Sequence, residues 1–243
     1  MRFLRRSGLI VVFLAVTAGA RAGEAPRVVV ELFTSQGCSS CPPADQLLGE
    51  LAAREDVLAL SLPVDYWDYL GWKDTLAERM FTTRQKGYGE VRGDRQVYTP
   101  QAVVNGSRHA VGSDGAAIGK AAETARKAGG FLVLAAEESG GTIRVKVPEG
   151  TAPAGGATVY LLPLRKRSEV AIGRGENGGR TATYHNVVRD IIPLGIWKGA
   201  AQTFDIPASA ARVRDADAFV AILQEGTRER PGAILGAVKG PGV

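Results

Sequence analysis

The chain has 243 residues, of which 45% are hydrophobic, and its 30 Lys and Arg against 25 Asp and Glu give a formal net charge of +5. Four of the basic residues lie before residue 23, and the remaining 26 form no run of the kind that binds nucleic acid or anionic lipid, so neither is an expected partner. The length suffices for one large domain or two small ones.

The N-terminus has the features of a cleaved export signal. Three arginines precede the apolar run Gly8–Val16, and Ala20-Arg21-Ala22 has the small-x-small pattern of a cleavage site. The run is too short to span a bilayer comfortably, and no later apolar stretch reaches about 18 residues. We therefore predict a signal peptide at 1–22, a periplasmic or secreted protein, and no stable membrane insertion after signal cleavage. A retained signal anchor is the alternative.

Residue patterns then predict a strand, a helix and a second strand. Val28–Ser35 is rich in β-branched and apolar residues, which indicates a buried strand. Asp45–Arg54 carries leucines at helical spacing, and Val57–Val64 is again apolar. In so short a span these elements form a right-handed βαβ unit with parallel strands.

The following segment predicts a helix, a hairpin and a last helix. Thr75–Tyr88 indicates the first of these helices. Asn105-Gly106 suits a two-residue type I′ turn between Gln101–Val104 and Arg108–Val111. Ala116–Lys127 is the second helix, which ends at two glycines.

Beyond residue 130 the pattern changes to short strands separated by Gly, Pro and Asn, which indicates an antiparallel sandwich or barrel. We therefore predict an α/β thioredoxin-like domain at 23–130, followed by an all-β sandwich-like domain at 131–243. The candidate strands are Phe131–Glu138, Thr142–Val147, Thr158–Leu164, Glu169–Ile172, Thr183–Arg189, Ala201–Ile206, Phe219–Gln224 and Ala233–Val238.

Both cysteines of the chain, Cys38 and Cys41, lie between the first strand and the first helix. A disulfide between them closes a small loop and adds little stability to a chain of this size, so reactivity explains the pair better than stability. A Cys-x-x-Cys at a strand-to-helix junction is the redox signature of thioredoxin-like proteins. Unpaired N–H groups at a helix start stabilise a thiolate. We expect Cys38 to be the exposed nucleophile and Cys41 the resolving thiol.

Three motifs together resemble the thioredoxin pattern: Glu31-Leu32-Phe33, the cysteine pair, and Tyr98-Thr99-Pro100 before the predicted hairpin. More narrowly, "ELFTSQGCSSCPPAD" with "VDYWDYLGWKD" is similar to the exported, uncharacterised family called domain of unknown function 1223. The resemblance implies that Pro100 is a cis-proline beside the disulfide that offers backbone to an extended substrate. It also implies that Glu31 is a buried acid that helps Cys41 lose its proton. The acid is Glu in place of Asp, and one extra residue separates it from the first cysteine.

The loop Asp65–Asp74 follows the second predicted strand, so it should emerge beside Cys38. Its aromatic and acidic side chains can form a wall that grips a peptide. The alternative is that the Trp rings pack beneath the loop and the aspartates cap the next helix. The predicted substrate-binding residues are Tyr66, Trp67, Asp68, Trp72 and Thr99.

The function that these residues favour is thiol-disulfide exchange with protein thiols or disulfides and a redox partner that the sequence does not identify. No cofactor or metal is predicted. Two alternatives stay open: a redox-inert thioredoxin-fold module that binds protein or glycan, and a copper-handling protein in which the two thiolates are soft ligands. The two histidines, His109 and His185, lie in different predicted domains, which disfavours a shared metal site.

Overall fold

The structure is a computed structural model that describes residues 25–243. The predicted signal peptide at 1–22 lies outside the described residues. The first half of the chain alternates strands and helices in the predicted order. Its elements are β1 (Val28–Thr34), α1 (Pro42–Ala52), β2 (Val57–Pro63), the 3-10 turn η1 (Asp68–Leu70), α2 (Arg79–Arg92), β3 (Gln101–Val104), β4 (Arg108–Val111) and α3 (Gly115–Ala128).

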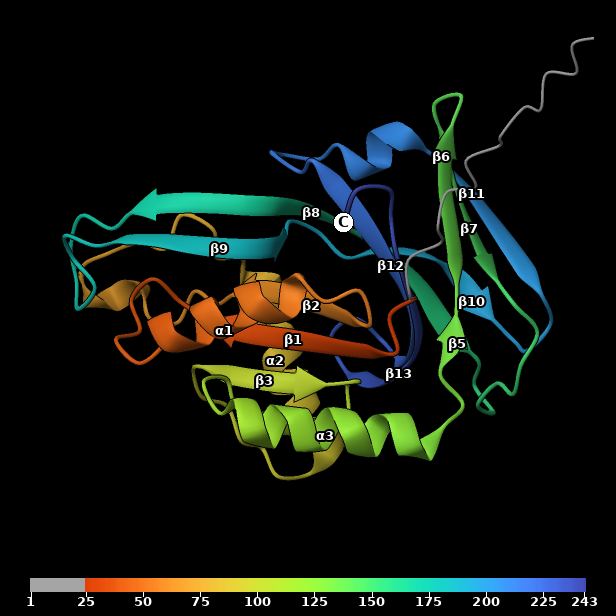
Figure 1. Cartoon of the computed structure of the whole chain (residues 1–243), viewed down its shortest axis with the longest axis horizontal. Helices are drawn as coiled ribbons and strands as arrows, with labels where there is room; N and C mark the ends of the chain where they lie inside the picture. The colour runs from red at the N-terminus through yellow and green to blue at the C-terminus, as the bar shows by residue number, and fades with distance from the viewer. Residues whose placement is uncertain (1–24) are drawn as a thin grey trace, which may run out of the picture.

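These four strands lie side by side in the order β4-β3-β1-β2. β1 and β2 are parallel, with Val28 opposite Val57, and β3 is antiparallel to β1. Because side chains alternate across a strand, β1 contributes to two cores. Val30 and Leu32 pack with α1 and α3, whereas Val29 and Phe33 pack with α2 on the opposite face. Figure 1 shows α1 and α3 in front of this sheet and α2 behind it.

The start of α2 differs from the prediction of a helix from Thr75. The carboxylate of Asp74 accepts the backbone N–H groups of Leu76 and Ala77 and so holds a non-helical turn there. The helix therefore begins only at Arg79. Side-chain bonds to nearby backbone N–H groups stabilise such turns at the expense of helix.

The second half is almost entirely strand. Its elements are β5 (Leu132–Val133), β6 (Ala135–Ser139), β7 (Thr142–Val147), β8 (Ala157–Ala171), β9 (Thr181–Val188), β10 (Ile192–Trp197), β11 (Gln202–Pro207), the 3-10 turn η2 (Ala208–Ala211), β12 (Ala218–Gly226) and β13 (Pro231–Lys239).

The sheet does not stop at residue 130. Strands of both halves form one ten-stranded mixed sheet in the order β4-β3-β1-β2-β9-β8-β12-β13-β5, with β10 paired to β8. β11, β7 and β6 form a separate three-stranded sheet. We predicted an all-β sandwich-like domain at 131–243. Most strands after residue 130 instead extend the first sheet, and the protein is a mixed α/β molecule with one large curled sheet (Figure 1).

A buried ion pair holds α2 against strands from both halves of the chain. Arg84 donates to Glu31 of β1 at 2.8 Å and to Gln224 of β12 at 2.7 Å, and all three side chains are fully buried. The Tyr88 hydroxyl donates to the same Glu31 carboxylate. Such a cluster is favourable only when every charge keeps its partner. It therefore couples the packing of the two halves.

None of the helices in residues 25–243 is both long and apolar enough to cross a membrane.

Candidate functional site

A tight turn connects β1 to α1 and carries the two cysteines. Cys38 donates its backbone N–H to the carbonyl of Ser35, and Cys41 donates to the carbonyl of Cys38, both at 3.1 Å. The two Cα atoms lie 5.4 Å apart, and the side chains form a disulfide. Cys41 is the N-cap of α1, so both prolines fall in the first helical turn, where an N–H group is not needed. Cys38 therefore lies on the turn before the helix.

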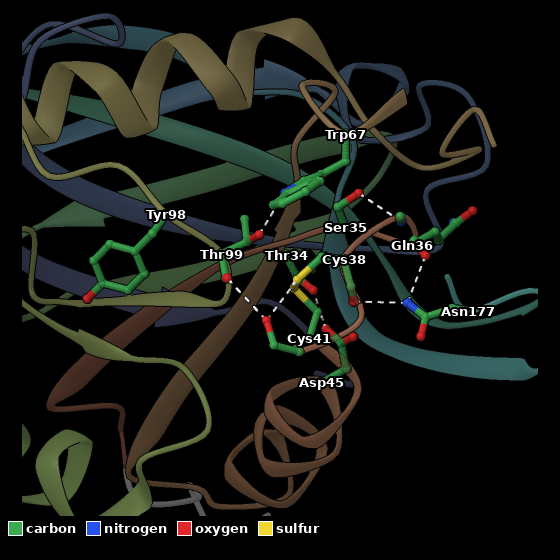
Figure 2. Close-up of a disulfide and its surroundings, with 12 residues drawn as sticks. Thr34, Ser35, Gln36, Cys38, Cys41, Asp45, Trp67, Tyr98, Thr99 and Asn177 are labelled. Carbon is green, nitrogen blue, oxygen red and sulfur yellow. Dashed lines mark hydrogen bonds between the residues drawn. A yellow bond between two sulfur atoms is a disulfide. The ribbon is translucent and has the colours of Figure 1, made fainter. Parts of the chain in front are cut away.

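The Thr99-Pro100 segment lies against this turn, although it is about 60 residues further along the chain. The peptide bond between them is cis, as the resemblance implied. The Ser40 hydroxyl bonds the Thr99 carbonyl at 3.5 Å and is 3.4 Å from the Cys38 sulfur. Figure 2 shows Thr99 beside the disulfide. The sequence motif thus brings together Cys38, Cys41 and Thr99-Pro100.

The exposure of the sulfurs differs from expectation. We expected Cys38 to be exposed, but it is 2% exposed and Cys41 is 0% exposed. Trp67 covers one side of the disulfide turn. Its Nε1–H donates to the Thr99 hydroxyl at 2.8 Å, and a Cβ added at Gly37 would lie 3.0 Å from the Cβ of Trp67. This close approach explains the glycine before Cys38. Attack on either sulfur therefore requires this cover to move.

Asn177, which comes from the turn between β8 and β9, holds the backbone of the disulfide turn. Its amide Nδ2 donates to the carbonyls of Gln36 at 3.0 Å and Cys38 at 2.9 Å (Figure 2). The side chain is 2% exposed, and its Oδ1 has no hydrogen-bond partner among residues 25–243. One amide from the second half of the chain therefore fixes the backbone that carries the disulfide.

The structure corrects the assignment of Glu31. Along β1, residues 28, 30, 32 and 34 face α1, so Glu31 faces α2 on the opposite side of the sheet, where Arg84 and Tyr88 hold its carboxylate. The extra residue between this acid and the first cysteine changes the face to which the side chain points. Glu31 thus belongs to the buried ion pair, away from the helix that carries Cys41.

Asp45 is the buried acid on the cysteine side. It lies one helical turn after Cys41, and its Oδ1 accepts the Thr34 hydroxyl at 2.7 Å (Figure 2). Burial, aided by the nearby Asp74, raises the pKa of Asp45 to about 8, against the lowering effect of Thr34. A carboxyl in this condition can exchange a proton near neutral pH, as a general acid or base must.

The aromatic loop at 65–74 divides into two parts. Trp67 lies at the disulfide, and Tyr66 and Trp67 pack against the main core. Trp72 instead donates to Gln36 at 2.8 Å, and its ring lies against Gly173 in the β8–β9 turn. Asp68 accepts the backbone N–H of Asp74. Trp72 and Asp68 therefore support the loop, as in the packing alternative, whereas Trp67 remains a candidate contact for a substrate.

Burial in turn raises the pKa of Asp74 to about 6, in spite of the backbone N–H groups that it accepts. Tyr69, which the sequence reasoning did not single out, is 78% exposed at the tip of this loop.

A cleft of about 530 Å³ opens on the Asn177 side of the disulfide turn. The first three turns of α1 form one wall, and consecutive residues at the start of β9 form the other. Asp45 and Asn177 both line it, so the buried carboxyl has a route to solvent here. Gln46 and Thr181–His185 also line the cleft.

The histidines have separate roles in packing. His109 contacts Tyr98 and Asp94 on the hairpin side, whereas His185 lies against Gly49 of α1. Within residues 25–243 no group of three or more His, Cys, Asp or Glu side chains is arranged to hold a metal ion.

Two site residues were missed from the sequence. Asp45 had a usable signal, because it shares the buried face of the helix with Ala44 and Leu48, and a carboxyl on such a face is unusual. Asn177 had none, since a Gly-rich turn more than 130 residues away gives no indication of where it docks.

The fold and the site define a class: a mixed α/β protein with a Cys-x-x-Cys disulfide between a strand and a helix. The chain belongs to the family described as "Protein of unknown function (DUF1223)", which it matches over residues 29–224. The crystal structure of protein AGR_C_4864 from Agrobacterium tumefaciens is similar, with a TM-score of 0.80 and 34% identity, over 91% of this chain and 98% of that one.

A protein from Archaeoglobus fulgidus described as "Probable Thioredoxin" is 45% identical over 38 residues. That match covers 16% of this chain and 42% of the relative, so the chain spans less than half of that relative's length.

Proposed function

We propose that this protein is an exported thiol-disulfide oxidoreductase built on a thioredoxin-like arrangement. The observation that carries the proposal is the Cys38–Cys41 disulfide at a strand-to-helix turn, facing the cis Thr99-Pro100 bond and lying on the same side of the sheet as the buried Asp45. The short likeness to a probable thioredoxin supports it. The apolar N-terminal run supports a periplasmic or secreted location, where disulfides persist.

In the reducing direction, the Cys38 thiolate attacks one sulfur of a substrate disulfide. A Cys38–substrate bond forms, and the other substrate sulfur leaves as a thiolate that takes up a proton. Cys41 then attacks the Cys38 sulfur, which releases the second substrate thiol and restores the Cys38–Cys41 disulfide. Two electrons pass from the cysteine pair to the substrate, and the oxidising direction is the exact reverse.

Asp45 is the group that we assign to the Cys41 proton. A carboxylate accepts that proton as Cys41 becomes the nucleophile of the second step. Because burial raises its pKa to about 8, the carboxylate form becomes frequent only as the pH approaches that value. The second step should therefore accelerate between about pH 6 and pH 8, and Asp45→Asn should remove this dependence.

Burial of both sulfurs favours a second candidate, a redox-inert clip in a binding module. Cys38 and Cys41 are almost completely covered, and unreactive structural disulfides are protected in this way. Under this alternative, Asn177 and Trp67 are permanent packing instead of a cover that opens.

Disulfide exchange with insulin separates the two candidates. The native protein should accelerate insulin reduction by dithiothreitol, and Cys38→Ser should abolish the effect. Cys41→Ser should accumulate a mixed disulfide that mass spectrometry detects. A Cys38→Ser protein with unchanged activity would refute the proposal, and a native disulfide that survives millimolar dithiothreitol without denaturant would establish the inert clip.

A further inference from the structure

The β9 wall of the cleft is the edge of a strand and not one of its faces. Neighbouring residues of a strand point to opposite faces, so a face would contribute every second residue. The cleft is instead lined by five consecutive residues, Thr181–His185. A cleft that follows a strand edge meets backbone N–H and C=O groups.

That edge has no partner strand over most of its length. β9 pairs with β8 along one side, from Thr181 to Val188. On the other side it pairs with β2 at Val187 alone. Asn186, which has a positive φ of 46°, donates its side-chain amide to the carbonyl of Ala59 at the point where the two strands separate. Within residues 25–243, Thr181–Tyr184 therefore lacks a neighbouring strand on the cleft side, whereas His185 packs against Gly49 of α1.

A buried acceptor without a partner lines the same cleft. Oδ1 of Asn177 makes no hydrogen bond within residues 25–243, although its Nδ2 makes two. Leaving a buried polar atom unpaired costs about 1–3 kcal/mol, so a donor supplied by a ligand would be favoured here. Peptide N–H groups are such donors.

We propose that this cleft binds an extended polypeptide segment, which adds as a strand to the free edge of β9 with Asn177 at one end. Strand addition supplies both donors and acceptors to an open edge, and a volume of about 530 Å³ suits a short extended segment. Because the cleft adjoins the disulfide turn, the segment belongs to the polypeptide that the proposed oxidoreductase would act on, and the inference rests on that function for the identity of its ligand.

The cleft is distinct from the substrate wall predicted from the sequence. Figure 2 shows Asn177 and Thr99 on opposite sides of the disulfide, with Trp67 above it and Asp45 below it. A polypeptide bound at β9 would therefore approach the cysteine turn from the opposite side to Thr99-Pro100. The two surfaces can be tested separately.

The test uses reduced and carboxymethylated ribonuclease A as a permanently unfolded, thiol-free polypeptide. Hydrogen exchange of the Cys38→Ser, Cys41→Ser double variant is followed by mass spectrometry with and without this probe. We expect slower exchange of the amides at 181–186 when the probe is present. Binding in this variant requires no redox chemistry. The probe can therefore bind even if the native protein does not reduce insulin, and the native protein can reduce insulin even if the probe does not bind.

Two further variants fill the cleft from opposite walls. Thr183→Trp on β9 and Gln46→Trp on α1 should each weaken probe binding on the order of tenfold or more. Thr203→Trp, on the exposed edge strand β11 of the other sheet, is the matched control and should leave binding unchanged. Three results would overturn the proposal. The probe could fail to bind, it could bind both cleft variants as well as the parent protein, or it could slow exchange only at residues 65–74 and 99–100.

Discussion

At the scale of single residues, the buried carboxyl of Asp45 determines how stability depends on pH. Its pKa is 3.8 in an unfolded chain and about 8 in the folded protein. Between these values the folded state keeps a proton that the unfolded state has released. Its contribution to stability is therefore complete at about pH 4 and is lost as the pH rises through 8. Asp74, with a pKa of about 6, acts in the same direction over a narrower range.

We predict that Asp45→Asn flattens this dependence. The amide keeps an acceptor for the Thr34 hydroxyl but cannot ionise. Raising the pH from 5 to 8.5 should therefore lower the free energy of unfolding of the variant by less than that of the native protein, and the difference should be at least about 2 kcal/mol. Urea unfolding at the two pH values measures this difference. Equal slopes in the native and variant proteins would show that Asp45 is ionised throughout.

Asn177 holds the turn that carries the disulfide, because its amide donates to the backbone carbonyls of Gln36 and Cys38. Asn177→Ala should increase the rate of disulfide reduction by dithiothreitol several-fold and cost about 1–3 kcal/mol of stability. Asn186→Ala is the control. It also removes an amide that donates to a backbone carbonyl, but that carbonyl belongs to Ala59, away from the disulfide. Similar acceleration in both variants would attribute the effect to general destabilisation.

Residue-level prediction from sequence succeeded where the chemistry is local. The position of the cysteine pair between a strand and a helix follows from a short motif, and the cis Thr99-Pro100 bond follows from the resemblance to the thioredoxin pattern. It failed for Glu31, because a single extra residue in a strand reverses the face to which a side chain points. The strand pattern alone does not show which face the cysteine helix will cover.

At the scale of elements, helix glycines report how closely α2 approaches the second half of the chain. A Cβ at Gly87 would lie 1.9 Å from the carbonyl oxygen of Glu229, next to β13. A Cβ at Gly119 of α3 would meet nothing within 4 Å. The first glycine is required by packing, and the second is not.

The two Gly→Ala variants should therefore change stability in opposite directions. Gly87→Ala must displace α2 from the β12–β13 turn and should cost about 2 kcal/mol or more, an overpacking effect. Gly119→Ala should stabilise by about 0.5–1 kcal/mol, because alanine is the better helix former. Thermal or urea unfolding measures both. Stabilisation by both substitutions would contradict the packing of α2 described above.

Element boundaries were predicted best where turn residues mark them. Asn105-Gly106 fixed the hairpin ends, and β7 has its predicted bounds. β8 was predicted as two strands because Arg165–Arg167 interrupts the apolar pattern. The strand continues past these residues because β8 stays paired with β9 there, beyond the end of its pairing with β12, and its charged side chains are exposed. β10 was missed because it contains Pro193 and Gly195, which an edge strand with irregular register tolerates.

At the scale of the whole molecule, the shared sheet and the Arg84 cluster make the two halves depend on one another. β2 is bordered by β9, and Tyr160 and Ile222 of the second half contribute to the core that contains Phe81 of α2. Sequence patterns could not predict this, because strand pairing between distant segments depends on topology and not on local composition.

A fragment of residues 25–130 should therefore not fold on its own. It would expose the β2 edge and leave Arg84 without Gln224. We expect no cooperative urea transition by circular dichroism and strong binding of a hydrophobic dye, in contrast to the full chain. A cooperative transition in the fragment would instead support two independent domains.

The most direct test of the central claim is the reduction potential of the Cys38–Cys41 pair in the native protein. It is measured by equilibration with glutathione buffers at pH 7 and alkylation of the free thiols. An exchanging pair should have a potential between about −270 and −120 mV, the range of known disulfide oxidoreductases. A potential below about −300 mV, typical of structural disulfides, would contradict the account.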